Sequence, residues 1–592
     1  MQIKNISTWN FTPQMEGLLF FANIIDEMTF NYTLDSFKAS VHNVFSLMRE
    51  SIETIDDIQD ETIKKGSLPP ILEEINDAII HDPIFNNIIK SKCYNLLVPK
   101  IKANTPYKEL KLILEMFLSK EVLDEYNDCL KANLSDLIKT KPNQKKNIEK
   151  LSRLFVAQMR FMGYPNASVH LKNKEFFFGY TSNIQSENDI DAFFRLFDFK
   201  REEYSVCLFG NKLYSYLANA LQQVQINITN TFNLLSWNTA YSNIRITPNK
   251  GQYIIIDIEG MDEYHAFERA RTKLVHFTSL FSFYHHKDQF KIIRNECIVR
   301  RKSDGACYRW AIPESPIMAC EDTFPTYASN IYQQIITKIK LDGDSFERFT
   351  KTIRLHDSAI RSSHTENQFL NLFTAFEVLI PKMPDSGKDR IVQIADMIIP
   401  YLCQHHFKKI ALSFGQDFRH WNNTLYKSIM AQVTDGNNEE EKLCALICLQ
   451  KYDFLRSQIM ADASTAHFYL LRFRLWKLNM RMGSIKNVKS TFMRFEERMR
   501  WHIIRLYRTR NLIVHAGAHP VYLDMLLENI HSFYDLFMKE LFTDITTHNA
   551  LKLEYSYFLH SQRYADYKQY LEGVDNNVPV NASNYLKVLG IN

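Results

Sequence analysis

Apolar residues recur at three- and four-residue spacing along two long parts of the chain. Between residues 36 and 164, VHNVFSLMRESIETIDDI and NIEKLSRLFVAQMRFMGY show this spacing, which is typical of amphipathic helices. From residue 326 onward almost every segment shows it, from YASNIYQQIITKI to YLDMLLENIHSFYDLFMKELF. Residues 1–35 fit a helix or a strand equally well. The pattern predicts a mainly α protein.

The apolar pattern changes between these two helical parts. Five segments show the shorter, β-rich pattern of strands: SVHLKNKEFFFGYT, YSVCLFG, GQYIIIDIEG, QFKIIRNECIVRR and ACYRWAIP. Two helical segments lie among them, KLYSYLANALQQVQINITNTFNLL and DEYHAFERARTKLVHFTSLFSFY. We therefore expect residues 1–325 to form an N-terminal α+β region with a sub-boundary near residue 160.

The C-terminal part is expected to be all helical. Residues 326–548 are predicted to form one helical domain, and residues 549–592 a helical tail that ends in the polar stretch VDNNVPVNASN. A helix stop is predicted at AGAHP, residues 516–520, because glycine follows the periodic run and proline comes shortly after.

Composition narrows the class of protein. The 592 residues suffice for two to four domains of about 150 residues, and only 16 glycines and 17 prolines favour long helices. The net charge is only +4, so a nucleic-acid surface would have to be local. The N-terminus lacks a signal-peptide pattern, and no apolar run reaches the roughly 18 residues of a membrane span. We expect a cytoplasmic protein without a membrane partner.

Motifs for metals and nucleotides are missing from the sequence. There is no H-E-x-x-H, no CxxC, no Walker A sequence and no G-x-G-x-x-G. The adjacent pairs His285–His286 and His405–His406 would point about 100° apart on a helix, so neither is a ready metal clamp. We expect no metal and no cofactor, and Cys444 and Cys448, the nearest pair among nine scattered cysteines, are expected to be reduced core residues.

Basic residues are concentrated between residues 472 and 510. Twelve lysines and arginines, among them Arg494, Arg498, Arg500 and Arg505, face only two glutamates there, a local balance of 12 − 2 = +10. A surface that binds RNA phosphates would have this composition. An ordinary solvated helix face, with its charge offset elsewhere in the fold, would have it too.

The basic stretch ends in RTRNLIVHAGAHP, residues 508–520. On an ideal helix Arg508 lies about 20° from His515, and Asn511 about 40° from it, away from the apolar side. Arg510 lies about 140° from His515, among apolar positions, so it must snorkel or pair with a buried carboxylate. Glu377, which interrupts the apolar run FTAFEVLIP, is a candidate partner.

The string R-N-x-x-x-H, formed by Arg510, Asn511 and His515, resembles the signature of HEPN domains. These helical bundles carry an arginine, four to six residues and a histidine, so Arg510 and Arg508 both fit. The segment NQFLNLFTAFEVLI resembles the earlier helix of the bundle. The resemblance covers residues 345–545, with extra helices between about 411 and 485, and the whole arrangement looks most like the ApeA-type anti-phage proteins.

The resemblance implies a metal-independent endoribonuclease that acts in abortive infection, with tRNA or mRNA as the RNA substrate. His515, Asn511 and Arg510 or Arg508 would be catalytic, with Glu377 and Tyr507 in support. Family register favours Arg510, whereas ideal helix geometry favours Arg508. The resemblance further implies a homodimer or higher homo-oligomer, and an N-terminal sensor or brake that responds to a phage-protein trigger.

Two other interpretations remain open at the level of sequence. A HEPN-like scaffold could bind RNA or a protein partner without cutting. Alternatively, Arg510 pairs with Glu377, Asn511 and His515 cap neighbouring helices, and the function lies in the N-terminal region. The position of His515 bears on this choice. A histidine that faces a basic cleft or a two-fold interface would weaken the bracing interpretation, whereas one sealed in a single core would weaken the ribonuclease interpretation.

Overall fold

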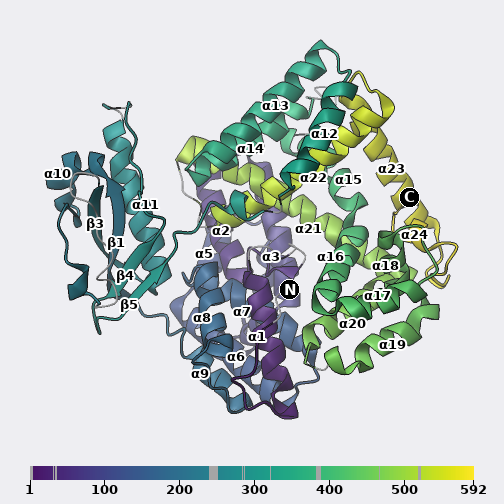
Figure 1. Ribbon diagram of the computed structural model, residues 1–592, viewed down its shortest axis with the longest axis horizontal. Helices are drawn as coiled ribbons and strands as arrows, with labels where there is room; N and C mark the ends of the chain where they lie inside the picture. The colour runs from purple at the N-terminus through teal and green to yellow at the C-terminus, as the bar shows by residue number, and fades with distance from the viewer. Residues whose placement is uncertain are drawn as a thin grey trace. The chain divides into compact units, whose positions relative to one another are not determined.

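The computed structural model describes residues 4–30, 33, 37–238, 251–282, 284–285, 287–320, 322–381, 389–465, 467–517, 520 and 522–591. These residues are mainly helical, with one small sheet (Figure 1). They divide into two compact units. The main unit contains residues 1–5, 12–154 and 315–592, and the sheet unit contains residues 6–11 and 155–314.

This division corrects the expected domain organisation. The joins at residues 154 and 314 lie close to the expected positions near 160 and 325. However, residues 12–154 pack with the C-terminal helices and not with the sheet, so residues 1–325 are not one region. Helical periodicity shows that a segment has a face to bury, but it does not show which distant segment will cover that face.

The sheet unit is built on five antiparallel strands in the order β2-β3-β1-β4-β5. The strands are β1 (Glu202–Asn211), β2 (Ile226–Thr229), β3 (Gly251–Gly260), β4 (Cys297–Arg301) and β5 (Cys307–Trp310). Its helices are α8 (Asn166–Phe178), α9 (Ile190–Phe194), α10 (Ala218–Gln222) and α11 (Glu263–Ser282). Helix α11 lies along one face of the sheet, where Phe267 and Leu274 pack against Ile254 and Val299 (Figure 1).

Two expectations for this unit were wrong. SVHLKNKEFFFGYT forms helix α8 and not a strand, because Val169, Asn173 and Phe177 recur every four residues and are buried on one face. Residues 212–235 do not form one helix, since the short helix α10 is followed there by strand β2. In both segments tertiary packing decided between two periods that the local pattern allows.

The N-terminal helices of the main unit form a layer of their own. They are α1 (Glu16–Thr29), α2 (Val44–Gln59), α3 (Pro69–His81), α4 (Pro83–Ser91), α5 (Tyr107–Phe117) and α6 (Lys120–Thr140). Helix α7 (Lys145–Phe161) then crosses from the main unit into the sheet unit. Residues 1–35, which fit either state, contain α1, which is buried over most of its length.

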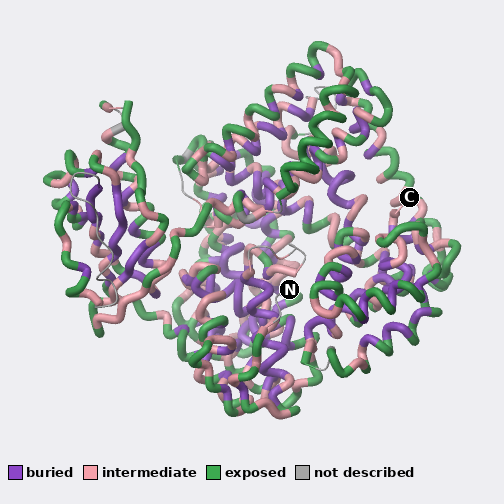
Figure 2. The backbone as a smooth tube through the Cα atoms, in the orientation of Figure 1, coloured by how far each residue is buried: buried purple, intermediate pink, exposed green. Residues whose placement is uncertain are grey.

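The C-terminal part of the main unit contains thirteen described helices. They are α12 (Pro325–Lys338), α13 (Gly343–Arg361), α14 (Thr365–Leu379), α15 (Arg390–Gln404), α16 (His406–Trp421), α17 (Asn423–Gln432), α18 (Glu439–Cys448), α19 (Asp453–Ala461), α20 (Tyr469–Met482), α21 (Ile485–Asn511), α22 (Leu523–His548), α23 (Glu554–Gly573) and α24 (Tyr585–Val588). One continuous hydrophobic core runs through all of them except α12, which has no buried residue. In Figure 2 buried positions alternate with exposed ones along most of these helices.

Helices α13, α14, α15, α21 and α22 pack on one another as a bundle, while α16, α18 and α20 form an adjoining group. That adjoining group occupies the segment, about residues 411–485, that was expected to hold extra helices.

The C-terminal residues 549–592 are helical but are more than a tail, because Tyr557, Leu571 and Val588 are buried in the same core. None of the described helices is long and apolar enough to cross a membrane.

Candidate functional site

The motif RTRNLIVHAG lies where helix α21 ends. The helix begins after Ser484, whose side chain accepts a hydrogen bond from the backbone N–H of Asn487, and it remains α-helical as far as Asn511. Residues Leu512–Ala516 then form a π-helical turn, closed by a hydrogen bond from the N–H of Gly517 to the carbonyl of Leu512. Gly517 has a φ of 59° and ends the helix as the sequence predicts.

Ideal helix geometry predicted Arg508 on the exposed side of this helix, but the structure buries it. Its exposed fraction is 2%, and its guanidinium forms an ion pair with Glu50 of α2 and donates to the carbonyl of Ser67 at 3.4 Å. Arg505, also buried, pairs with the same Glu50 at 3.3 Å and with Glu74 of α3. The N-terminal helices therefore cover the side of α21 that carries both arginines.

The other basic side chains of α20 and α21 are also largely paired. Arg494 makes a bidentate pair with Asp77 at 2.7 and 2.6 Å, and Arg500 pairs with Asp396 at 2.9 Å. Further along the same helices, Arg474 pairs with Glu27 and Asp417, and Lys477 pairs with Glu149. Arg498 is exposed. The charge of the 472–510 stretch is thus largely offset by carboxylates from distant parts of the chain.

The proposed RNA-binding arginines therefore differ in what they can do. Arg505 is enclosed in ion pairs, and Arg494 and Arg500 are held by carboxylates at the surface. A phosphate would have to displace those carboxylates in order to bind. Of the two interpretations of the basic stretch, these contacts favour the helix face whose charge is offset elsewhere in the fold.

Arg510 has a different environment from Arg508. Its Nη2 atom is 3.6 Å from Oε2 of Glu377 in α14, and both side chains are about one-quarter exposed, at 27% and 23%. Its Nη1 atom donates to Oδ1 of the neighbouring Asn511 at 3.0 Å. An arginine pairs most strongly with a carboxylate through two parallel hydrogen bonds, and this single, longer contact leaves most of the fork uncommitted to Glu377.

His515 lies in the π turn and is exposed, and no hydrogen bond joins its imidazole to another described residue. The π turn changes the angular position of His515. On an α-helix, positions five apart are separated by about 140°, and the wider i→i+5 turn over Leu512–Ala516 reduces the angle between Arg510 and His515 below that value.

Two further residues border this group of side chains. The ring of Tyr507 packs against Phe373 of α14, with the ring centroids 6.0 Å apart. Arg390, at the start of α15, donates to the carbonyls of Glu377 at 2.9 Å, Ile380 at 2.7 Å and Pro381 at 2.9 Å. Burial lowers the pKa of Arg390, although the nearby Glu377 and Tyr507 act in the opposite direction.

Sequence reasoning missed Arg390 as a neighbour of the motif. The only signal for it was its position at the first turn of a helix after the loop PKMPDSGKD, of which residues 382–388 lie outside the described residues. We call Arg510, Asn511, His515, Glu377 and Arg390 the motif site. It combines two guanidinium groups and an accessible imidazole with one carboxylate, so its formal charge is positive when the histidine is neutral.

The carboxyl of Glu50 anchors the buried side of α21. Burial by itself would raise its pKa, but the charges of Arg505 and Arg508, with a contribution from His42, outweigh burial and hold the pKa far below its ordinary value of 4.5. A carboxylate whose pKa is depressed in the folded state contributes stability above its unfolded pKa, and that contribution is lost as the pH falls.

Comparison with known proteins gives no relative for this chain. No protein-family model, no curated protein and no solved structure matches it.

We expect Glu50→Gln to lower the free energy of unfolding by about 3–5 kcal/mol at neutral pH, because Arg505 and Arg508 would lose a buried counter-charge. The difference from the wild type should shrink as the pH falls below 4.5, where the wild-type carboxylate also begins to lose its charge in the unfolded state. Urea unfolding at several pH values measures both effects. Glu73→Gln, at an exposed position of α3, is the control and should leave stability nearly unchanged.

Proposed function

We propose that this chain is a metal-independent endoribonuclease of the HEPN type that acts in anti-phage abortive infection. The observation that carries the proposal is the exposed His515 in a π turn directly after Arg510 and Asn511. A histidine that only braced a helix junction would be buried and hydrogen-bonded. An accessible imidazole that follows Arg510 by five residues is instead suited to a phosphodiester.

RNA supplies its own nucleophile for this reaction, the 2′-hydroxyl. In the proposed mechanism His515 exchanges a proton with the reacting oxygens, and Arg510 binds the phosphate and stabilises the charge that develops on it. Asn511, which accepts a hydrogen bond from Arg510, orients that guanidinium. The 2′-oxygen attacks the phosphorus, the 5′-oxygen leaves with a proton, and the products are a 2′,3′-cyclic phosphate and a 5′-hydroxyl.

The position of the two arginines supports Arg510 as the motif arginine. Arg508 is enclosed with Glu50 and has no access to a substrate, whereas Arg510 is partly exposed and is held by one longer contact with Glu377. Glu377 would hold the Arg510 guanidinium in place until phosphate binds. Tyr507 and Arg390 support this arrangement from α21 and α15.

One histidine cannot readily act as base and acid in the same step, so the proposal includes a homodimer that brings two motif sites together. Helix α12 supports association of some kind because it buries none of its side chains. Its exposed apolar residues, with Phe324 just before the helix, are Phe324, Tyr327, Ile331, Tyr332 and Ile336. A patch of this kind on a helix marks a surface for a protein partner.

The N-terminal helices supply most of the carboxylates that hold the basic face of α20 and α21, namely Glu27, Glu50, Glu74, Asp77 and Glu149. We propose that they act as the brake on the ribonuclease, because a face held in ion pairs cannot bind RNA. A phage protein that binds this layer would be the trigger. The substrate class, tRNA or mRNA, would be selected by the surface around His515.

We expect wild-type protein to cleave RNA in the presence of EDTA, and His515→Ala to be slower by about 100- to 10,000-fold, the usual range for loss of a general acid or base. Fragment ends should carry cyclic phosphate and 5′-hydroxyl groups. His548→Ala, which changes an exposed histidine near the end of α22, is the control and should cleave like the wild type. Equal cleavage by wild type and His515→Ala would remove His515 from the mechanism.

Substitution of the two arginines should have opposite consequences. Arg510→Lys keeps the charge but loses the planar fork, so cleavage should fall by about 100-fold with the fold intact. Arg508→Lys should instead lower the free energy of unfolding by about 1–3 kcal/mol, because charged hydrogen bonds to Glu50 and Ser67 are weakened, with cleavage per folded molecule retained. Cleavage rates and urea unfolding, measured on the same preparations, separate the two roles. The reverse pattern would make Arg508 the motif arginine.

A HEPN-like scaffold without catalysis is the second candidate function. The paired basic face and the exposed apolar residues of α12 favour it.

Both candidate functions predict that the double substitution Tyr332→Glu with Ile336→Glu converts a dimer to a monomer, because both side chains are more than 60% exposed on one face of α12. Light scattering measures this change. Leu112→Glu, at an exposed apolar position of α5, is the matched control and should leave the dimer intact. The scaffold alone predicts a dimer that never cleaves RNA.

A further inference from the structure

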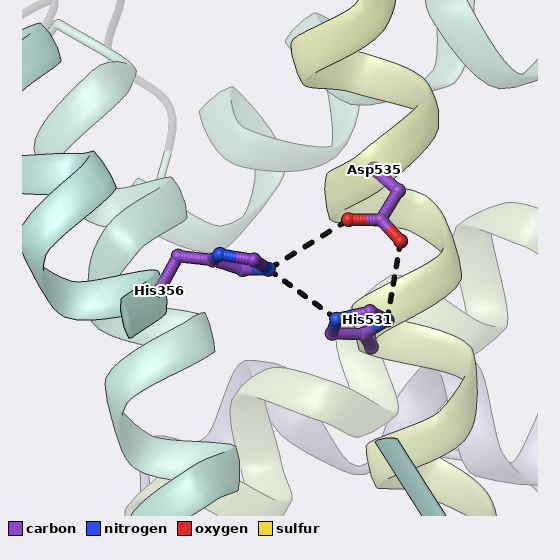
Figure 3. A group of neighbouring side chains, drawn as sticks. All are labelled: His356, His531 and Asp535. Carbon is purple, nitrogen blue, oxygen red and sulfur yellow. Dashed lines mark hydrogen bonds and ion pairs between the residues drawn. The ribbon is translucent and has the colours of Figure 1, made fainter. Parts of the chain in front are cut away.

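Two histidines and an aspartate, none of them part of the motif site, meet between helices α13 and α22. His356 comes from α13, whereas His531 and Asp535 come from α22, four residues apart and therefore on one face. Figure 3 shows the three side chains pointing toward a common centre. One metal ion could be held by three or more histidine, cysteine or carboxylate side chains that lie close together. Among the described residues such a group is formed by these three, whose ligand atoms all lie within 4.8 Å of one another.

The distances within this cluster fit a tetrahedral metal ion. The Nε2 atoms of His356 and His531 are 3.3 Å apart. Two ligands at the usual zinc–nitrogen distance of about 2.0–2.1 Å, separated by a tetrahedral angle, are also about 3.3 Å apart. The carboxylate oxygen Oδ1 of Asp535 is 3.8 Å from Nε2 of His356, so a movement of roughly half an ångström would bring it to the same spacing.

The nitrogens that face each other are Nε2 of His356 and Nε2 of His531. Oδ2 of Asp535 lies 3.2 Å from Nδ1 of His531, an ion-pair distance without hydrogen-bond geometry, so Asp535 is counted as a ligand and not as the partner that orients the ring. When Nδ1 of His531 carries the proton, the lone pair resides on Nε2, where it can ligate a metal.

Burial and access also suit a bound ion. The side chain of His531 is 8% exposed and that of His356 is 24% exposed, so both rings are held between the two helices. The carboxyl side chain of Asp535 is 43% exposed, which gives an ion a path from solvent.

We propose that His356, His531 and Asp535 form a zinc site that ties α13 to α22. His356 and His531 ligate through Nε2, Asp535 ligates through Oδ1, and water fills the fourth position. Helices α13 and α22 both belong to the bundle that carries the motif site, so the ion would brace that bundle. The proposal does not depend on the ribonuclease function, and its test uses no RNA.

Without a metal the same residues could form only a hydrogen-bonded stack. The ring of His356 stacks on Tyr534, with centroids 4.9 Å apart and an interplanar angle of 12°, and lies at 23° to the ring of His531. A stack of that kind would have no affinity for zinc beyond that of any surface histidine. The two possibilities therefore differ in metal stoichiometry and in the spectrum of a substituted ion.

The test begins with full-length protein stripped by a chelator, loaded with Zn²⁺ and dialysed, after which the zinc content is measured. The wild type should retain one zinc ion per chain, and added Zn²⁺ should raise its Tm. His356→Ala and His531→Ala should each weaken binding by more than about 100-fold, and Asp535→Asn by about 10- to 100-fold. Loading with Co²⁺ should give the visible absorption of a tetrahedral site in the wild type only.

His81→Ala provides the matched control. His81 pairs with Asp77 four residues earlier on α3, at 3.2 Å, so it has the same spacing as His531 and Asp535 but no second histidine opposite. The His81→Ala variant should therefore bind zinc like the wild type. Circular dichroism verifies folding, and Asp535→Asn, which keeps the shape of the side chain, remains informative if His531→Ala does not fold. Zinc retained equally by wild type and the ligand variants, or by none of them, would refute the site.

Discussion

The ion pairs between the N-terminal helices and α21 are the contacts on which the main unit depends most. Glu50 sits between Arg505 and Arg508, and Glu74 adds a second carboxylate to the same group. Burying two guanidinium groups is costly unless each is paired, so neither arginine could take its place without α2 and α3. The same contacts join segments more than 400 residues apart into one compact unit.

This constraint determines what remains accessible at the end of α21. The N-terminal helices enclose one side of the helix, and the bundle helices α14 and α15 pack against another. The last residues of the motif form the π turn, in which His515 is exposed. The site is thus small, and any substrate would have to approach it at the helix terminus and not along the basic face.

The proposed zinc site and the motif site would have different roles in one helical bundle, the first structural and the second chemical. A ribonuclease of this type needs no metal for its chemistry, because the nucleophile belongs to the substrate and the proton transfers are made by histidine. A metal ion between α13 and α22 would instead fix the helices around the site. Since His356 and His531 are 175 residues apart, only the folded chain can bring them together.

The sequence by itself determined most helical elements from residue 36 to 164 and from residue 326 onward, the sheet strands β1, β3, β4 and β5, and the helix stop at Gly517, because these follow from local periodicity and from the conformational freedom of glycine. It did not determine α8, which reads locally as a strand. It also singled out Arg510 and Glu377 as partners, since a charge within an apolar run needs a counter-charge. Only the tertiary structure decided that Arg508 is buried and that the basic stretch is largely neutralised. Both outcomes depend on carboxylates hundreds of residues away, and a local pattern carries no information about which distant helix will supply them.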